Sequence, residues 1–188
     1  MRIIGIDPGL TGAIGTTLWA ENGQTFVYAD MMPKQGKLVD IRKVRDLIES
    51  RLELLKGGMG TYKPADLVVV EEMSPFPTKL KGKDDKAVFG GAVTNFRMGE
   101  RLAELRTMCL LEGWPFITIK PISWKVRVFV GKNWRGNSKD LAVEVIQALY
   151  PQFDIPDAKY KKYAMCDALC LALYGKQFHM PQQEDSSF

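Results

Sequence analysis

Apolar residues follow two patterns along the chain, which together predict a mixed α/β domain. Short, dense apolar runs are typical of strands and occupy residues 2–7, 11–19, 25–29, 66–71 and 117–119. Longer stretches are typical of helices and occupy residues 40–55, 88–112, 138–149 and 163–174. Because Asn22-Gly23 is a hairpin signal, we expect three adjacent antiparallel strands at the amino end. The order β, β, β, α, β, α, β, α, α predicts an α/β fold.

Turn and capping residues mark the predicted boundaries. Asp40 and Ser138 are expected to cap the amino ends of two helices, and Gly175 to end the last one. Gly12 and Gly15, in the second strand, permit close approach of another backbone segment. These positions therefore predict where the elements end and where the backbone can be approached closely.

The length of 188 residues is that of one domain. We expect a single domain at 1–175 and a polar carboxyl-terminal tail at 176–188, without repeats or a linker. The net charge of +4 agrees with a nucleic-acid partner, but charge alone decides little. The basic residues form two groups along the chain: Lys79, Lys81, Lys83 and Lys86, then Lys120, Lys125, Arg127, Lys132, Arg135 and Lys139.

The cysteines argue against a disulfide framework and against a zinc site. Cys109, Cys166 and Cys170 are odd in number and include no CxxC pair. Cys166 and Cys170 lie four apart on an apolar helix, so we expect buried free thiols. The amino end resembles no signal peptide, and no stretch has the length of a membrane span, so we expect a cytoplasmic protein without a membrane partner.

Three acidic residues suggest a metal site. Asp7 closes the first strand and Glu71 closes the fourth, so both project from one end of the sheet if these strands are neighbours. Asp167 is expected at the inner edge of the last helix. Taken alone, each acid is explained by an ordinary structural role: Asp7 by a turn, Glu71 by the entry to a loop and Asp167 by a solvated helix position. Only the three together, in this order, favour a common metal site.

Carboxylates that are gathered together repel one another, and a divalent cation removes that repulsion. Oxygen ligands favour Mg²⁺ or Mn²⁺ over zinc. Two such ions, roughly 4 Å apart, activate a water and stabilise the leaving oxygen of a phosphodiester. The only histidine, His179, lies in the polar tail, which excludes a histidine-based site.

Four motifs in this order resemble the RuvC-like Holliday junction resolvases, and particularly their phage branch. They are Ile-Gly-Ile-Asp-Pro-Gly at 4–9 with Thr-Gly-Ala at 11–13, Val-Val-Glu-Glu at 69–72, Pro-Ile-Ser-Trp-Lys at 121–125 with the later Lys139, and Cys-Asp-Ala-Leu-Cys-Leu-Ala at 166–172. The resemblance spans the chain to about Gly175. It implies an RNase H-like fold, a five-stranded mixed sheet with helices on both faces, and a crossover junction endodeoxyribonuclease.

By this resemblance, Asp7, Glu71 and Asp167 are the catalytic and metal-binding residues, with two Mg²⁺ ions, or Mn²⁺ in their place. Glu71 is preferred over Glu72 because alternation puts Glu72 on the other face of the strand. The expected DNA-binding residues are Phe76, Lys79, Lys81, Lys83, Lys125 and Lys139. Trp124 is interpreted as a core residue.

One position departs from the family. A further metal ligand, Asp or His, usually lies one helical turn before the last Asp, where this chain has Ala164. Three explanations stay open: Glu72, Asp157 or Lys161 substitutes for the ligand, the natural protein is weakened or inactive, or the sequence carries a deliberate disabling change. The native gene sequence at position 164 would decide the third.

The resemblance also implies a homodimer. A four-way junction is two-fold symmetric, so symmetric cutting requires two sites on a two-fold dimer. The predicted helix at 88–112 matches the helix that forms the family's dimer interface. Its larger apolar residues supply either that interface or the core: Phe89, Phe96, Met98 and Met108.

Three functions follow from these observations. The first is hydrolysis of a phosphodiester in a four-way junction or other branched DNA by metal-bound water, leaving 5′-phosphate and 3′-hydroxyl ends. The alternative is a weakened or non-catalytic junction-binding protein, motivated by Ala164. An actin-like or sugar-kinase ATPase also matches Asp-Pro-Gly-Leu-Thr at 7–11, but those proteins need two domains that 188 residues cannot hold.

Overall fold

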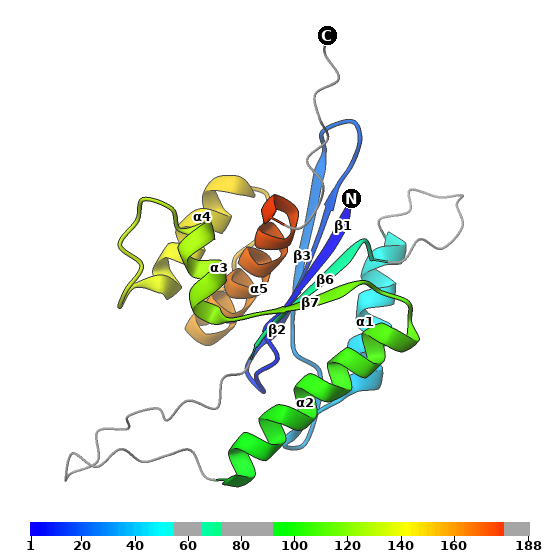
Figure 1. Ribbon diagram of the computed structural model, residues 1–188. Coiled ribbons are helices and arrows are strands. Elements are labelled where there is room, and N and C mark those ends of the chain that lie inside the picture. The colour runs from blue at the N-terminus through cyan, green and yellow to red at the C-terminus, as the bar shows by residue number, and fades with distance from the viewer. Residues whose placement is uncertain (55–64, 73–91, 179–188) are drawn as a thin grey trace, which may run out of the picture.

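The computed structural model describes residues 1–54, 65–72 and 92–178 (Figure 1). The main sheet comprises β1 (Arg2–Ile6), β2 (Ala13–Trp19), β3 (Thr25–Met31), β6 (Leu67–Glu71) and β7 (Phe116–Ile119). A small hairpin comprises β4 (Lys34–Gln35) and β5 (Leu38–Val39). The helices are α1 (Ile41–Leu54), α2 (Ala92–Leu111), α3 (Pro121–Val128), α4 (Ser138–Leu149) and α5 (Lys159–Phe178). In the described part of the chain, no helix has the length and apolar character needed to cross a membrane.

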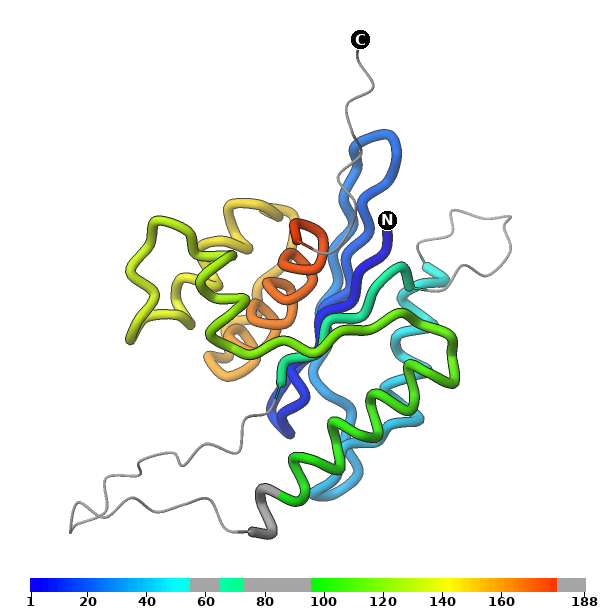
Figure 2. Tube along the Cα trace, viewed as in Figure 1, coloured from blue at the N-terminus to red at the C-terminus, as the bar shows by residue number. Residues whose placement is uncertain are grey.

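The five strands form one mixed sheet in the order β3-β2-β1-β6-β7. The first three strands are antiparallel neighbours, as expected from the sequence, and β6 and β7 extend the sheet in parallel with β1. Helices α1 and α2 cover one face and α3, α4 and α5 cover the other (Figures 1 and 2). The predicted α/β architecture with helices on both faces is confirmed.

Alternation along the buried strands creates two cores. On β1 and β6, Ile3 and Val69 belong to the core beneath α3, α4 and α5, whereas Ile4 and Val68 belong to the core beneath α1 and α2. Successive side chains of a strand point to opposite faces, so odd-numbered positions of both strands face α5. By the same alternation, the odd-numbered acidic residues at the ends of these strands, Asp7 and Glu71, also face α5.

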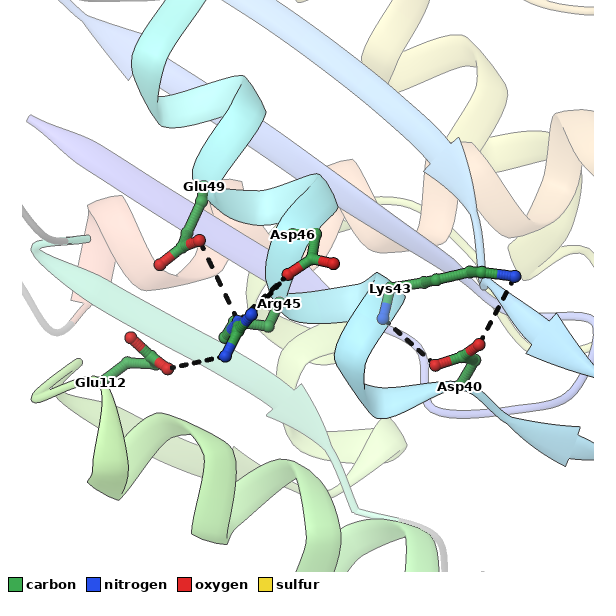
Figure 3. Close-up of polar contacts among 6 residues, drawn as sticks. All are labelled: Asp40, Lys43, Arg45, Asp46, Glu49 and Glu112. Carbon is green, nitrogen blue, oxygen red and sulfur yellow. Dashed lines mark hydrogen bonds and ion pairs between the residues drawn. The ribbon is translucent and has the colours of Figure 1, made fainter.

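Helix α1 begins as the sequence predicts. Asp40 precedes it, and its Oδ1 accepts a hydrogen bond from the backbone N–H of Lys43 at 3.2 Å (Figure 3). Arg45 lies between α1 and α2, with contacts to Asp46 at 2.8 Å and Glu112 at 4.0 Å. These exposed ion pairs add little stability, so the buried face of α1 holds the helix on the sheet.

Helices α3, α4 and α5 differ from the prediction. Helix α3 was not predicted at all, and α5 begins at Lys159 rather than at residue 163. Ser138 is the first helical residue of α4 and Asn137 precedes it, without a side-chain capping bond. Helix α5 passes through Gly175 to Phe178, because this glycine serves packing: an added Cβ would lie 2.7 Å from Cγ2 of Val69.

Helix α5 lies unusually close to the sheet. Gly5 and Gly15 are directly opposite one another on β1 and β2. A Cβ on Gly5 would lie 2.0 Å from the backbone oxygen of Ala168, and a Cβ on Gly15 would lie 2.7 Å from the backbone nitrogen of Leu169. The expectation that Gly15 permits close backbone approach is confirmed, and α5 is the segment that approaches.

We predict that Gly5→Ala destabilises the fold by about 3 kcal/mol, because the new methyl group collides with helix backbone that cannot rotate away. Thermal unfolding measures the loss, which corresponds to a melting temperature lower by roughly 6–12 °C for a chain of this size. The matched control is Gly99→Ala in α2, where a Cβ meets nothing within 4 Å. This control should be neutral or stabilising by up to about 1 kcal/mol; equal effects of both changes would contradict the packing argument.

Candidate active site

Two of the three predicted acids end neighbouring parallel strands. Ile6 of β1 is in register with Val70 of β6, and Asp7 and Glu71 come next on the two strands. Adjacent strands lie about 4.8 Å apart, and both residues are odd-numbered positions on the face covered by α5. The condition stated from the sequence, that the two strands be neighbours, is therefore met.

A tight turn holds Asp7. Its Oδ1 accepts a hydrogen bond from the backbone N–H of Gly9 at 3.1 Å, and its own N–H donates to the carbonyl of Ala13 at 3.0 Å. Gly12 is required here, because an added Cβ would lie 2.1 Å from the carbonyl oxygen of Asp7. The Asp-Pro-Gly turn thus fixes the backbone of Asp7 where β1 ends.

Glu71 is bonded to a tryptophan. The indole Nε1 of Trp124, on α3, donates to Oε1 of Glu71 at 2.9 Å. Burial raises the pKa of Glu71; the hydrogen bond from Trp124 opposes that rise, and the charge of Asp7 adds to it. Trp124 is a fully buried core residue, as expected, but the sequence interpretation missed its role in orienting Glu71.

Asp167 reaches the same edge from α5. Its Oδ2 accepts a short hydrogen bond from Nζ of Lys139, in the first turn of α4. Its Oδ1 is buried and has no hydrogen-bond partner among the residues that the structure describes. Burial raises the pKa of Asp167, and the charge of Lys139 opposes the rise. A buried carboxylate oxygen without a donor is costly, so this atom indicates where a further cation fits.

Two lysines supply positive charge around the acids. Burial alone would lower the pKa of Lys139, but the charges of Asp167, Asp7 and Glu71 outweigh burial and raise it. Nζ of Lys125 lies 5.2 Å from the ring centre of Trp124, and its charge favours the ionised forms of Glu71 and Asp167. The five charged groups therefore interact as one site at the carboxyl ends of β1 and β6.

Three residues are the candidate substitutes for the missing ligand: Glu72, Asp157 and Lys161. Glu72 is bonded through its backbone N–H to Ile119 at 2.8 Å. Asp157 is exposed before α5, and Lys161 is half-buried in its first turn. Within residues 1–54, 65–72 and 92–178, none of the three forms a hydrogen bond or ion pair with Asp7, Glu71 or Asp167.

Ala164 lies at the amino end of α5, one turn before Asp167. It is 5% exposed and packs with Ala13 and Ala168 in a small apolar cluster. Ala13 is the residue whose carbonyl accepts the N–H of Asp7. The position is therefore close to the site, but its present surroundings are apolar and contain no ligand atom from residue 164.

Several predicted residues fall outside the described part of the chain: Phe76, Lys79, Lys81, Lys83, Lys86, Phe89 and His179. Of the apolar residues expected on α2, Met108 lies in the core and Phe96 is exposed. The two cysteines of α5, Cys166 and Cys170, are buried and free, as expected.

The carboxylates suit a hard divalent cation in their chemistry, and the unpaired Oδ1 of Asp167 offers an available ligand atom. Over the described residues, however, no three His, Cys, Asp or Glu side chains are gathered closely enough to form a metal centre. Glu71 faces Trp124 and Asp167 faces Lys139 instead. Shared coordination therefore requires these side chains to turn toward a common point.

Comparison with solved structures agrees with the architecture. The chain is similar to RuvC of Thermus thermophilus, with a TM-score of 0.56 and 17% sequence identity over 94% of this chain and 93% of that chain. It is also similar to T. thermophilus RuvC in complex with Holliday junction substrate, with a TM-score of 0.53 and 15% identity over the same shares. No family model and no curated protein matches the sequence. The RNase H-like fold predicted from the sequence is thereby confirmed.

We predict that Glu71→Gln stabilises the metal-free protein at neutral pH, because it removes a buried charge that Asp7 and Asp167 repel. The raised pKa means that ionisation of Glu71 weakens the fold, and this cost is present above the unfolded-state pKa and vanishes below it. In EDTA, the melting temperature should rise by about 2–4 °C at pH 7 and stay unchanged at about pH 3. Glu53→Gln, on the exposed surface of α1, is the control; a lower melting temperature for Glu71→Gln at pH 7 would contradict the assignment.

Proposed function

We propose that the protein is a divalent-metal-dependent endodeoxyribonuclease that cuts branched DNA, with four-way junctions as its main substrate. The observation that carries the proposal is that Asp7 and Glu71 follow in-register residues of the neighbouring strands β1 and β6, with Asp167 near enough for its charge to act on Glu71. The buried, unpaired Oδ1 of Asp167 adds a ligand atom. The similarity to a RuvC bound to Holliday junction substrate supports the choice of substrate.

In this proposal Asp7, Glu71 and Asp167 hold Mg²⁺, or Mn²⁺ in its place, at two positions. When bound, the ions supply an activated water and stabilise the leaving oxygen. Trp124 holds Glu71 in one orientation through its indole N–H. Lys125 and Lys139 provide positive charge where the scissile phosphate would approach, a contact that gives affinity without reading sequence.

Further contacts to DNA and a second subunit belong to the same proposal. Phe76, Lys79, Lys81 and Lys83 would contact the junction from the segment that follows Glu71. A two-fold dimer would place two sites on the two-fold symmetric junction. Helix α2 offers exposed apolar residues for that interface: Phe96, Leu110 and Leu111, which are 67%, 68% and 81% exposed. The likeness to the phage branch of the family extends the proposal to a bacteriophage origin.

The proposal is tested by cleavage of a labelled synthetic four-way junction in Mg²⁺ or Mn²⁺, beside linear duplex. We predict symmetric nicks in the junction and a loss on the order of 1,000-fold for Asp7→Asn, which removes a metal ligand. Junction binding in EDTA should change by no more than about twofold, because neutralising the acid removes no phosphate contact. Asp46→Asn, exposed on α1, controls for charge; cutting that persists in Asp7→Asn would refute the assigned site.

A non-catalytic junction-binding protein is a second candidate, and the apolar surroundings of Ala164 favour it. A chain without the further ligand would bind branched DNA through its basic residues and cut it slowly or not at all. Both candidate functions involve binding of branched DNA, and they differ only in whether bound metal ions support cleavage.

Ala164→Asp separates them. The new carboxylate should lower the melting temperature in EDTA, because it is buried among Ala13 and Ala168. If the site is a weakened nuclease, the variant should gain more stability from Mg²⁺ than the unmodified protein does, since a ligand that binds the folded state raises stability by mass action. Its junction cleavage should then increase at least about tenfold. The double variant with Asp7→Asn is the control. Tight junction binding without cleavage in Mg²⁺ or Mn²⁺, even after Ala164→Asp, supports the non-catalytic protein.

A further inference from the structure

Residues 113–139 carry a strong local charge. This segment contains six of the chain's 26 basic residues and none of its 22 acidic ones. Because six exceeds the net charge of +4, the rest of the chain is net negative. The modest net charge therefore includes one concentrated basic region at residues 113–139.

The segment borders the candidate site at two points. It runs through the edge strand β7, helix α3 and the turn that leads into α4. From α3, Trp124 bonds to Glu71, and from the first turn of α4, Lys139 bonds to Asp167. The inner face of the segment thus contributes directly to the site, and DNA, which is much longer than the site, would extend from it onto the solvent-exposed outer face of the segment.

That outer face carries exposed apolar side chains, which we call the α3 ridge: Ile122, Val126 and Val130, with exposed fractions of 57%, 50% and 75%. Ile122 and Val126 are one helical turn apart, on the opposite side of α3 from the buried Trp124. Val130 follows the helix, with Phe129 between it and the last helical residue, Val128. Large apolar residues gathered on a basic, solvent-exposed face are typical of a binding surface rather than of packing.

We propose that the α3 ridge and the basic residues beside it bind DNA next to the site. In this arrangement the ridge contacts sugars and exposed base surfaces at the branch, and Lys120, Arg127 and Arg135 contact phosphates. The inference rests on the proposed function and extends it to a surface outside the carboxylate site. Apolar side chains contact thymine methyl groups and insert at unstacked base steps in other DNA-binding proteins.

Charge decides between DNA and a protein partner. Residues 113–139 supply positive charge and no Asp or Glu of their own, and a surface of one sign complements a polyanion such as DNA. Lys132 does pair with Glu144 at 3.0 Å, and the guanidinium of Arg127 lies 5.1 Å from the ring centre of Phe178. These contacts orient the basic side chains, and a polyanion remains the complementary partner.

The experiment compares two sets of variants in EDTA, so that no strand is cut. The first is Ile122→Ala/Val126→Ala/Val130→Ala, which shortens the ridge and keeps good helix formers. The second is Lys120→Gln/Arg135→Gln, which removes two charges. Leu149→Ala, 51% exposed at the far end of α4, and Lys43→Gln on α1 are the matched controls. Fluorescence anisotropy with a labelled four-way junction and a linear duplex gives Kd at several salt concentrations.

We expect the ridge variant to weaken junction binding about tenfold, with little change in duplex binding and no change in salt dependence, because it removes apolar contacts alone. The charge variant should weaken binding to both DNAs and reduce the slope of log K against log salt by about one for each charge removed. Both controls should bind like the unmodified protein. Melting temperatures should stay unchanged, because these positions are exposed, and this measurement checks that all variants fold.

The outcomes separate the two proposals. Junction affinity that is unchanged in the ridge variant, while the unmodified protein binds and cuts junctions, overturns the inference and leaves the proposed function standing. Unchanged DNA affinity with an altered oligomeric state in sedimentation assigns the ridge to a protein contact and also overturns it. An unmodified protein that neither binds nor cuts branched DNA overturns both.

Discussion

The close approach of α5 to the sheet is the constraint on which the rest of the structure depends. Gly5 and Gly15 lie opposite each other, and a Cβ on either would collide with helix backbone. At the far end of the contact, Gly175 performs the same task against Val69. Any larger residue at these positions would lift the helix off the strands. The position of Asp167 relative to Asp7 and Glu71 follows from this contact.

This packing creates an electrostatic problem that the surrounding residues solve only in part. Asp7 and Glu71 lie on the face that α5 covers, and Asp167 lies on α5 itself. Burial raises the pKa of both Glu71 and Asp167. Trp124 and Lys139 each satisfy one carboxylate oxygen. Within the described part of the chain, Oδ1 of Asp167 still has no hydrogen-bond partner. A fold that buries charges without completing their bonds is typical of a site that binds an ion or a substrate.

Much of this arrangement was predictable from the sequence, because it depends on local patterns of apolar and acidic residues. Apolar strands that end in Asp7 and Glu71 predicted both acids at one edge, and the pairing of β1 with β6 bears out that premise. Helix α3 was missed because it has only eight residues and leaves Ile122 and Val126 exposed, which breaks the usual amphipathic pattern. The bond from Trp124 to Glu71 joins residues 53 positions apart. Such a contact depends on tertiary packing, and no local pattern records it.

Ala164 shows how the packing constraint and the site chemistry oppose each other. The same close approach that brings Asp167 to the sheet presses residue 164 against Ala13. A small residue relieves crowding there, whereas a carboxylate would need both space and a cation to offset its burial. With alanine, the protein keeps a well-packed helix end beside three charged acids. Stability in the absence of metal therefore favours alanine, and tighter metal binding would favour a ligand at that position. Which of the two dominates in this chain determines whether the proposed DNA-binding surface around α3 would deliver DNA to an active site or only hold it.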